Sequence, residues 1–245
     1  MPHYQEDLAY IQAVAFGDLA KGAMPAVIER LRATPIRVRR VVDVGCGAGI
    51  STRALVDAGF DTVAIEPSAS LLAIARNTAP GARFKLGSVH EVALEPCEAL
   101  LALGEPLTYH GPDMDADARL HAFCERAARA LTPGGLMIFD LIEAEGAPLD
   151  ARGWSSGDDW AILYEAREDR AARRITRHIE TFRSKAAGTT GYRRSREVHD
   201  ACTFEIREVK RWLEGAGFSV ETADRYGAYA LAPRRRAFFA TRHRR

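Results

Sequence analysis

The sequence lacks the features that would place it in a special class of protein. No apolar run reaches the roughly 18 residues that a membrane-spanning helix needs. The four cysteines are scattered along 245 residues, which excludes both the paired spacing of a metal site and a dense disulfide framework. The chain also has no internal repeat and no low-complexity tract. These absences leave an ordinary globular protein without a metal site.

The first residues lack the basic-then-apolar pattern of a secretory signal, since they include His3, Glu6 and Asp7. We therefore expect a cytoplasmic protein with reduced thiols and no membrane partner.

Net charge is nearly absent at +1, but the two halves of the chain differ. Residues 1–150 carry 13 Lys and Arg against 20 Asp and Glu, whereas residues 151–245 carry 21 against 13. A basic segment can mark an anionic partner such as nucleic acid. The arginines are dispersed over half-polar strands, however, and this pattern favours a solvated face.

The chain does contain a regular alternation of strand and helix patterns. Apolar periodicity predicts helix over residues 7–32, with a break near Gly22 and Pro25. Further helices are predicted at 51–58, 68–75 and 120–131, between strands at 41–44, 62–65, 82–86, 98–103 and 136–141. We expect an α/β fold with a doubly wound, Rossmann-like, mostly parallel sheet.

After about residue 143 the pattern becomes that of antiparallel strands. Segments rich in Thr, Ile, Tyr and Phe at 160–165, 174–182 and 192–204 predict an inserted β-meander. A helix over 206–213 and strands at 218–222 and 237–241 complete the chain.

The stretch VVDVGCGAG ends the first predicted strand in a glycine-rich turn. Gly45, Gly47 and Gly49 remove side chains where a nucleotide-like ligand approaches the backbone of such a sheet. The third glycine of a dinucleotide-binding motif would fall at Ile50, so the spacing weakens an NAD interpretation. Asp43 would repel a pyrophosphate and attract a cationic ligand.

Glu66 ends the second predicted strand, about 20 residues after the glycines. An acid at this place accepts the two hydrogen bonds of a ribose diol in nucleoside sites. A glycine turn or a strand-end acid alone is weak evidence, but their order here favours a nucleoside site.

These residues resemble the successive motifs of class I S-adenosylmethionine-dependent methyltransferases. The resemblance runs over roughly residues 38–143, through VVDVGCGAG, VAIEPS, FKLGSV, EALLALGEPLTY and LTPGGLMIFD. It implies S-adenosylmethionine as cofactor, with S-adenosylhomocysteine as product. One departure is Ser88, where many relatives carry Asp.

The resemblance also implies the role of each matched residue. Asp43, Gly45 and Gly47 would line the methionine and ribose, and Glu66 would hold the ribose hydroxyls. Ser88 and Val89 would border the adenine, and Leu103 and Gly104 would face the sulfonium. The implied cofactor-binding set is Asp43, Gly45, Cys46, Gly47, Glu66, Pro67, Ser88, Val89, Leu103 and Gly104.

Candidates for a catalytic base lie outside that set. Glu197 and His199 project to the same face of a predicted strand, where a carboxylate can orient an imidazole and raise its basicity. A purely structural pair is the alternative. Tyr109, with Glu105 and His110 nearby, follows the fourth strand, where the acceptor should enter.

We thus expect an enzyme that methylates an oxygen or nitrogen of a small-molecule acceptor. The chain would be one domain over residues 1–245, divided into an N-terminal helical cover (1–37), a cofactor-binding core (38–143), an antiparallel insertion forming the acceptor pocket (144–204), and a C-terminal helix with the last strands (205–245). Alternatives are an RNA methyltransferase, a non-catalytic S-adenosylmethionine-binding regulatory protein, or another use of the same cofactor.

Overall fold

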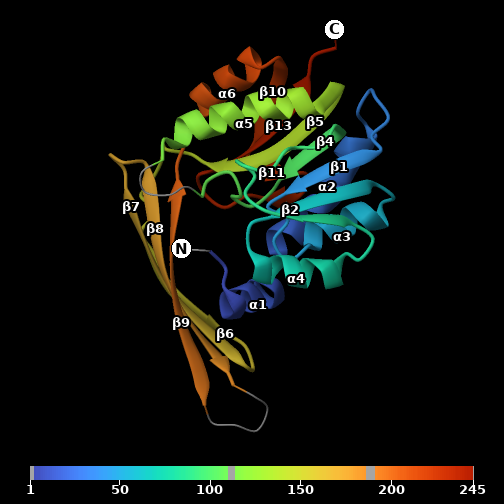
Figure 1. Cartoon of the computed structure of the whole chain (residues 1–245). Coiled ribbons are helices and arrows are strands. Elements are labelled where there is room, and N and C mark those ends of the chain that lie inside the picture. The colour runs from blue at the N-terminus through green and yellow to red at the C-terminus, as the bar shows by residue number, and fades with distance from the viewer. Residues whose placement is uncertain (1–2, 110–113, 186–190, 245) are drawn as a thin grey trace.

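The structure is a computed structural model that describes residues 3–109, 114–185 and 191–244. It contains two main sheets with helices around the larger one (Figure 1). The helices are α1 (Glu6–Ala15), α2 (Asp18–Arg32), α3 (Ile50–Asp57), α4 (Ala69–Thr78), α5 (Ala116–Ala130) and α6 (Ile206–Gly215).

The larger sheet has seven strands in the order β10-β13-β5-β4-β1-β2-β3. Strands β1 to β5 run parallel to one another, and β13 is antiparallel to both of its neighbours. The strands are β1 (Arg40–Val44), β2 (Asp61–Glu66), β3 (Arg83–Leu86), β4 (Cys97–Ala102), β5 (Leu131–Ile142), β10 (Phe218–Ala223) and β13 (Arg235–Arg242).

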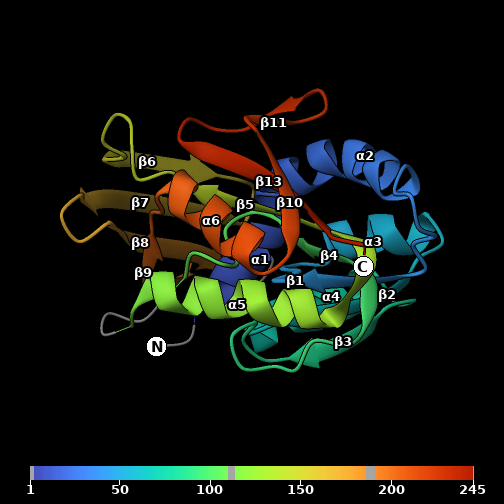
Figure 2. The same ribbon diagram turned by 90° about the horizontal axis from the view of Figure 1, so that it is seen from above.

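Helices cover both faces of this sheet (Figures 1 and 2). Val41 packs with residues of α2 and α3, whereas the next residue, Val42, packs with residues of α5 and α6 on the opposite face. Successive side chains of a strand point to opposite faces, so a strand covered on both sides is apolar at every position. This explains the continuous apolar run that precedes Asp43.

The smaller sheet is the antiparallel insertion between β5 and α6. Its order is β6-β7-β8-β9, with β6 (Ala151–Ser156), β7 (Trp160–Asp169), β8 (Arg174–Ser184) and β9 (Tyr192–Cys202). It projects from the core, and α1 lies against it and against α4 (Figure 1). A bridge between Tyr109 and Ala201 joins the insertion to the loop after β4. The predicted doubly wound sheet with an inserted β-meander is confirmed.

Several sequence-based element boundaries were wrong. The break in the N-terminal helix lies at Phe16 and Gly17, and Pro25 stands inside α2, which continues past it. At Gly22 an added Cβ would lie 2.1 Å from the ring of Tyr229. This glycine therefore allows the ring to pack closely against α2, and it does not interrupt the helix. Strand β5 begins at Leu131, five residues before the predicted start, with a register irregularity opposite β4.

Two further differences concern strands that the pattern did not indicate. The insertion has an additional edge strand, β6, and a short hairpin of β11 (Arg225–Tyr226) and β12 (Tyr229–Ala230) precedes β13.

Within the described part of the chain, no one helix has the length and apolarity to cross a membrane; the bent pair α1 and α2 passes that test only when taken together.

Candidate active site

A cavity of about 610 Å³ lies at the carboxyl ends of the parallel strands. Its size falls within the range of small-molecule sites, and its place is the usual crevice of a doubly wound sheet. Among the described residues, its wall includes the loops after β1, β2, β3 and β4 and the segment before α1. Nine of the ten predicted cofactor residues line it: Gly45, Cys46, Gly47, Glu66, Pro67, Ser88, Val89, Leu103 and Gly104.

The glycine loop forms one wall of the cavity. Gly45 has φ of +65°, and a Cβ on it would lie 2.1 Å from Cβ of Pro106. Gly47 has φ of +55°, but a Cβ there would meet no atom within 4 Å. The first glycine is therefore required by packing against the β4 loop, whereas the second leaves open space beside the backbone.

Glu66 places a carboxylate in the cavity wall while only 4% of the residue is exposed. Its Oε2 accepts the N–H of Gly47 at 2.9 Å, and its Oε1 accepts the N–H of Ser68 at 2.9 Å. Burial raises the pKa of Glu66 to about 7, although both backbone bonds act to lower it. A carboxylate offers about four acceptor positions, so two remain for a ligand.

Asp43 is the one predicted cofactor residue that does not line the cavity. It lies beneath the glycine loop, where Oδ2 accepts the hydroxyls of Ser51 at 2.8 Å and Thr52 at 2.6 Å. Burial raises the pKa of Asp43 to about 6. In this arrangement Asp43 fixes the start of α3 against β1, and its charge also helps to raise the pKa of Glu66 in the cavity wall.

The loop after β3 closes the end predicted to hold the adenine. Ser88 Oγ accepts the N–H of His90 at 3.2 Å. Arg126, from α5, donates to the carbonyl oxygens of Val89 and His90 at 2.9 Å each, and also to that of Val92. One guanidinium thus holds three carbonyls of this loop, and sequence reasoning did not identify Arg126.

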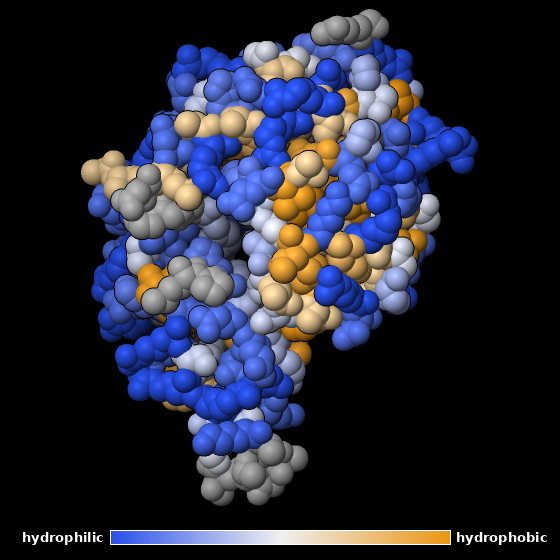
Figure 3. Space-filling model, viewed as in Figure 1, coloured by the Kyte–Doolittle hydropathy of each residue, from blue (hydrophilic) through white to orange (hydrophobic). Residues whose placement is uncertain are grey.

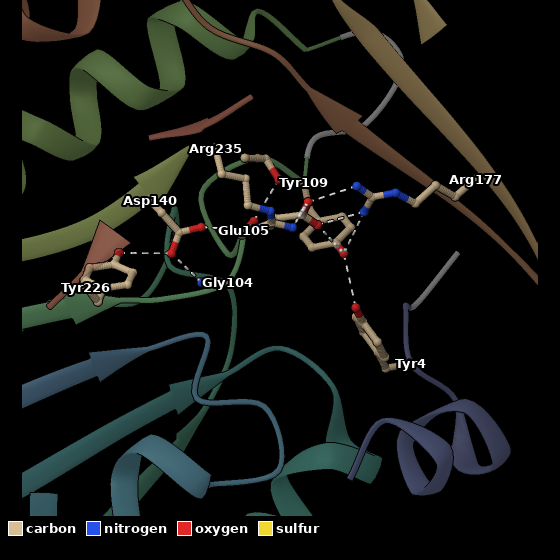
Figure 4. A network of polar contacts seen from close by, with 9 residues as sticks. Tyr4, Gly104, Glu105, Tyr109, Asp140, Arg177, Tyr226 and Arg235 are labelled. Carbon is tan, nitrogen blue, oxygen red and sulfur yellow. Dashed lines mark hydrogen bonds and ion pairs between the residues drawn. The ribbon is translucent and has the colours of Figure 1, made fainter. Parts of the chain in front are cut away.

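The opposite end of the cavity contains a charged network (Figure 4). Glu105 follows Gly104 with a left-handed φ of +81°, a strained conformation for a side-chain-bearing residue. Its carboxylate accepts Arg177 Nη1 at 2.7 Å and Nη2 at 2.9 Å, and it also contacts Arg235. Although burial acts to raise it, Arg235 and Arg177 hold the pKa of Glu105 below its usual range.

Asp140 extends the network behind the cavity. Its Oδ1 accepts Arg235 Nη1 at 3.0 Å, and its Oδ2 accepts the N–H of Gly104 at 2.8 Å and the hydroxyl of Tyr226 at 3.1 Å. The network therefore fixes the backbone at Gly104, which the resemblance places near the reacting centre.

Tyr109 lines the same end of the cavity. Its hydroxyl lies 3.3 Å from Glu105 Oε2 and 3.1 Å from the hydroxyl of Tyr4. Burial, and then the charge of Glu105, raise the pKa of Tyr109, so its hydroxyl stays protonated. His110, its neighbour in the sequence, lies outside the described residues.

Glu197 and His199 are brought together as the strand pattern predicted, but beneath the N-terminal segment. Glu197 Oε2 lies 2.8 Å from His199 Nε2, and the same carboxylate accepts the N–H groups of Tyr4 at 2.7 Å and Gln5 at 2.9 Å. His199 is 1% exposed and packs on the rings of His3 and Tyr4. His3 and Tyr4 line the cavity, whereas His199 lies behind them. The pair thus holds the segment that closes this side.

Comparison with known proteins agrees with this geometry. A family model described as a methyltransferase domain matches residues 16–223. The chain belongs to the methyltransferase-domain family. The prediction of a class I S-adenosylmethionine-dependent methyltransferase is confirmed, both as an enzyme class and in its cofactor.

Relatives of this methyltransferase are distant in sequence. A methyltransferase of Geobacillus sp. (strain WCH70) is 24% identical over 191 residues, 74% of each chain. A malonyl-[acyl-carrier protein] O-methyltransferase of Enterobacter lignolyticus (strain SCF1) is 27% identical over 158 residues, which span 64% of this chain and only 56% of that protein.

Solved structures show the same fold. An S-adenosylmethionine-dependent methyltransferase from Clostridium acetobutylicum ATCC 824 superimposes with a TM-score of 0.80 at 15% identity, covering 96% of this chain and 97% of the other. A sugar N-methyltransferase from Streptoalloteichus sp ATCC 53650 gives 0.76 at 22% identity, covering 98% and 94%.

The residues of the cavity fit S-adenosylmethionine. The Glu66 carboxylate retains acceptor positions for a ribose diol, and the space beside Gly47 accommodates a ligand against the backbone. Both features are observed in the half of the cavity where the resemblance places the nucleoside.

Proposed function

We propose that this methyltransferase transfers the methyl group to an oxygen or nitrogen of a small-molecule acceptor. The observation that carries the proposal is one cavity of about 610 Å³ whose wall holds both the nucleoside-binding residues and the Tyr109–Glu105 end. Donor and acceptor would then meet within one enclosed space. The O-methyltransferase and the sugar N-methyltransferase named above supply the precedent for both acceptor atoms.

The bound cofactor supplies a methyl group on a positively charged sulfur. The residues of the chain contribute alignment and exclusion of water, which carry much of the rate of an in-line displacement. Glu66 would bind the ribose, the loop held by Arg126 would border the adenine, and Gly104, whose N–H donates to Asp140, would face the sulfonium.

Tyr109 is the predicted catalytic residue best placed to touch an acceptor, because it alone of the three lines the cavity. Its protonated hydroxyl would orient the acceptor rather than remove a proton. A base role for His199, oriented by Glu197, stays a prediction that requires the segment around His3 and Tyr4 to move aside.

The antiparallel insertion, predicted over residues 144–204, would form part of the acceptor pocket. It contributes Arg177 to the cavity wall. The surface at the lower left of Figure 3 is largely hydrophilic. In the insertion, the exposed Arg194 and Arg196 each lie 2.6 Å from Glu180. Arginines already paired with carboxylates favour a solvated face over an RNA footprint. A cytoplasmic location remains part of this proposal.

The test is calorimetric titration with S-adenosylmethionine and S-adenosylhomocysteine, followed by a screen of small amines, alcohols and carboxylic acids for labelled-methyl transfer. We expect saturable binding of both nucleosides, and transfer to at least one class of small acceptor. Transfer to RNA alone, or binding without turnover over the whole panel, would contradict the proposal.

The wild type is compared with Glu66→Gln, which loses the buried carboxylate, and with Glu95→Gln, which makes the same change in a surface ion pair of Lys85. Only the first should weaken nucleoside binding.

A further inference from the structure

Two arginines from different sheets converge on the acceptor end of the cavity. Arg177 comes from β8 of the insertion and Arg235 from β13 of the large sheet, and both contact the carboxylate of Glu105 (Figure 4). Their side chains are 24% and 20% exposed, and both line the cavity. They are thus partly desolvated and still reachable by a ligand.

The two guanidinium groups have more donors than Glu105, Asp140 and Tyr109 use. Each guanidinium has five N–H donors. Toward the described residues Arg177 uses three of its five donors, two toward Glu105 and one toward Tyr109. Arg235 uses two, one each toward Glu105 and Asp140. The Nε groups of both arginines take no part in these hydrogen bonds to the described residues.

Positive charge also exceeds negative charge on the described cavity wall. Three guanidinium groups, those of Arg119, Arg177 and Arg235, line the wall with the carboxylates of Glu66 and Glu105. A third carboxylate, that of Asp140, lies behind the wall and pairs with Arg235. The guanidinium of Arg119 has no carboxylate partner among the described residues, and its Nη1 donates to Met114 Sδ at 2.8 Å. S-adenosylmethionine adds a further positive charge, because its ammonium and sulfonium outnumber its carboxylate.

We propose that the acceptor carries an acidic group, a carboxylate or a phosphate ester, bound by Arg177 and Arg235 beside Glu105. A planar guanidinium binds such a group with paired, charge-assisted hydrogen bonds. Glu105 orients both arginines and offsets part of their charge, so the pair stays in place before the acceptor arrives. This inference rests on the proposed function and names the acceptor class that the same cavity selects.

The test uses matched probes on the protein saturated with S-adenosylhomocysteine. Benzoate is compared with benzamide, and phenyl phosphate with phenol, by calorimetry at fixed ionic strength. We expect at least one anion to bind about tenfold or more tightly than its neutral partner. The carboxylate and phosphate arms tell the two kinds of acidic group apart.

Substitutions of the two arginines test whether they cause the preference for the anionic probe over its neutral partner. Arg177→Gln and Arg235→Gln should each remove the anion preference, whereas Arg177→Lys keeps the charge and should retain part of it. Arg194→Gln, an exposed arginine paired with Glu180 outside the cavity, is the matched control and should change nothing. Circular dichroism and urea unfolding report whether each variant is folded, and the affinity for S-adenosylhomocysteine is measured separately.

Several outcomes would overturn the inference. These are equal binding of anion and neutral partner in both probe pairs, or an anion preference that survives in either folded Gln variant. A loss of S-adenosylhomocysteine affinity in folded Arg177→Gln, without a loss of anion preference, would show that the arginine serves the methionine carboxylate. Failure of the proposed function is distinct, because the wild type would then not bind the nucleoside or would transfer no methyl group.

Discussion

The buried carboxylate of Glu66 predicts that cofactor affinity depends on pH. In the cavity without a cation, burial raises the pKa of Glu66 to about 7. A bound sulfonium compound and a ribose diol that donates to the carboxylate both favour the ionised form. Binding therefore lowers the pKa of Glu66, and a proton is released when S-adenosylmethionine binds near neutral pH.

The size of the effect follows from the ionised fraction. With a pKa of about 7, the ionised fraction of Glu66 is about one tenth at pH 6 and about nine tenths at pH 8. The Kd for S-adenosylmethionine should therefore fall about tenfold between these pH values. Calorimetry at pH 7 in two buffers of different ionisation enthalpy should detect release of roughly half a proton.

A matched pair of variants isolates this group. Glu66→Gln removes the titrating group, so its weaker binding should show no such pH dependence. Glu95→Gln should behave as the wild type, because Lys85 and Arg83 hold the pKa of Glu95 below its usual range, outside pH 6 to 8. A tenfold change that persists in Glu66→Gln, or a wild-type Kd that is flat from pH 6 to 8, would refute the reasoning.

Two further predictions concern the glycine loop. Burial raises the pKa of Asp43 from 3.8 to about 6, so the folded state holds the carboxyl proton more tightly than the unfolded state does. The contribution of this carboxyl group to the free energy of unfolding therefore falls as pH rises through about 6. Asp43→Asn retains one oxygen for Ser51 and Thr52 but does not titrate. In urea unfolding, the free energy of unfolding of the variant minus that of the wild type should therefore rise by about 1–3 kcal/mol from pH 4 to pH 7. A difference that is the same at both pH values would contradict this. Gly47→Ala and Gly59→Ala both place Cβ at positive φ, +55° and +90°, with no atom within 4 Å, so each should lose about 1–2 kcal/mol of unfolding free energy. Only Gly47→Ala should also weaken S-adenosylmethionine binding, because Gly47 lines the cavity, and equal Kd values for the two variants would remove Gly47 from the ligand site.

Local patterns in the sequence were sufficient for the large sheet and for most of the cofactor side. The continuous apolar run at Val41 and Val42 indicates a strand covered on both faces, and the structure confirms this. The positions of Gly47 and Glu66 follow from the same pattern, because parallel strands place their carboxyl ends at one edge. The side of the loop on which Asp43 lies did not follow, since it depends on the hydroxyls of α3.

Helix and strand boundaries were less predictable. Pro25 was taken as part of a break, yet the ends of α1 and α2 are set by Phe16 and Gly17. Gly22 was given the same role, but it allows the ring of Tyr229, which is distant in the sequence, to pack on α2. Such contacts have no counterpart in local propensity.

By itself, the sequence determined a doubly wound sheet, a glycine-floored nucleoside site and a methyltransferase resemblance, because each depends on residues close together along the chain. Only the tertiary structure decided the charged end of the cavity, where we propose that the acceptor binds. Arg177 and Arg235 are 58 positions apart in the printed sequence and meet at Glu105 because the insertion is joined to the loop after β4 through the Tyr109–Ala201 bridge. Strand periodicity cannot distinguish these two from the other arginines of the basic half, because the long-range packing of the two sheets determines which arginines reach the cavity.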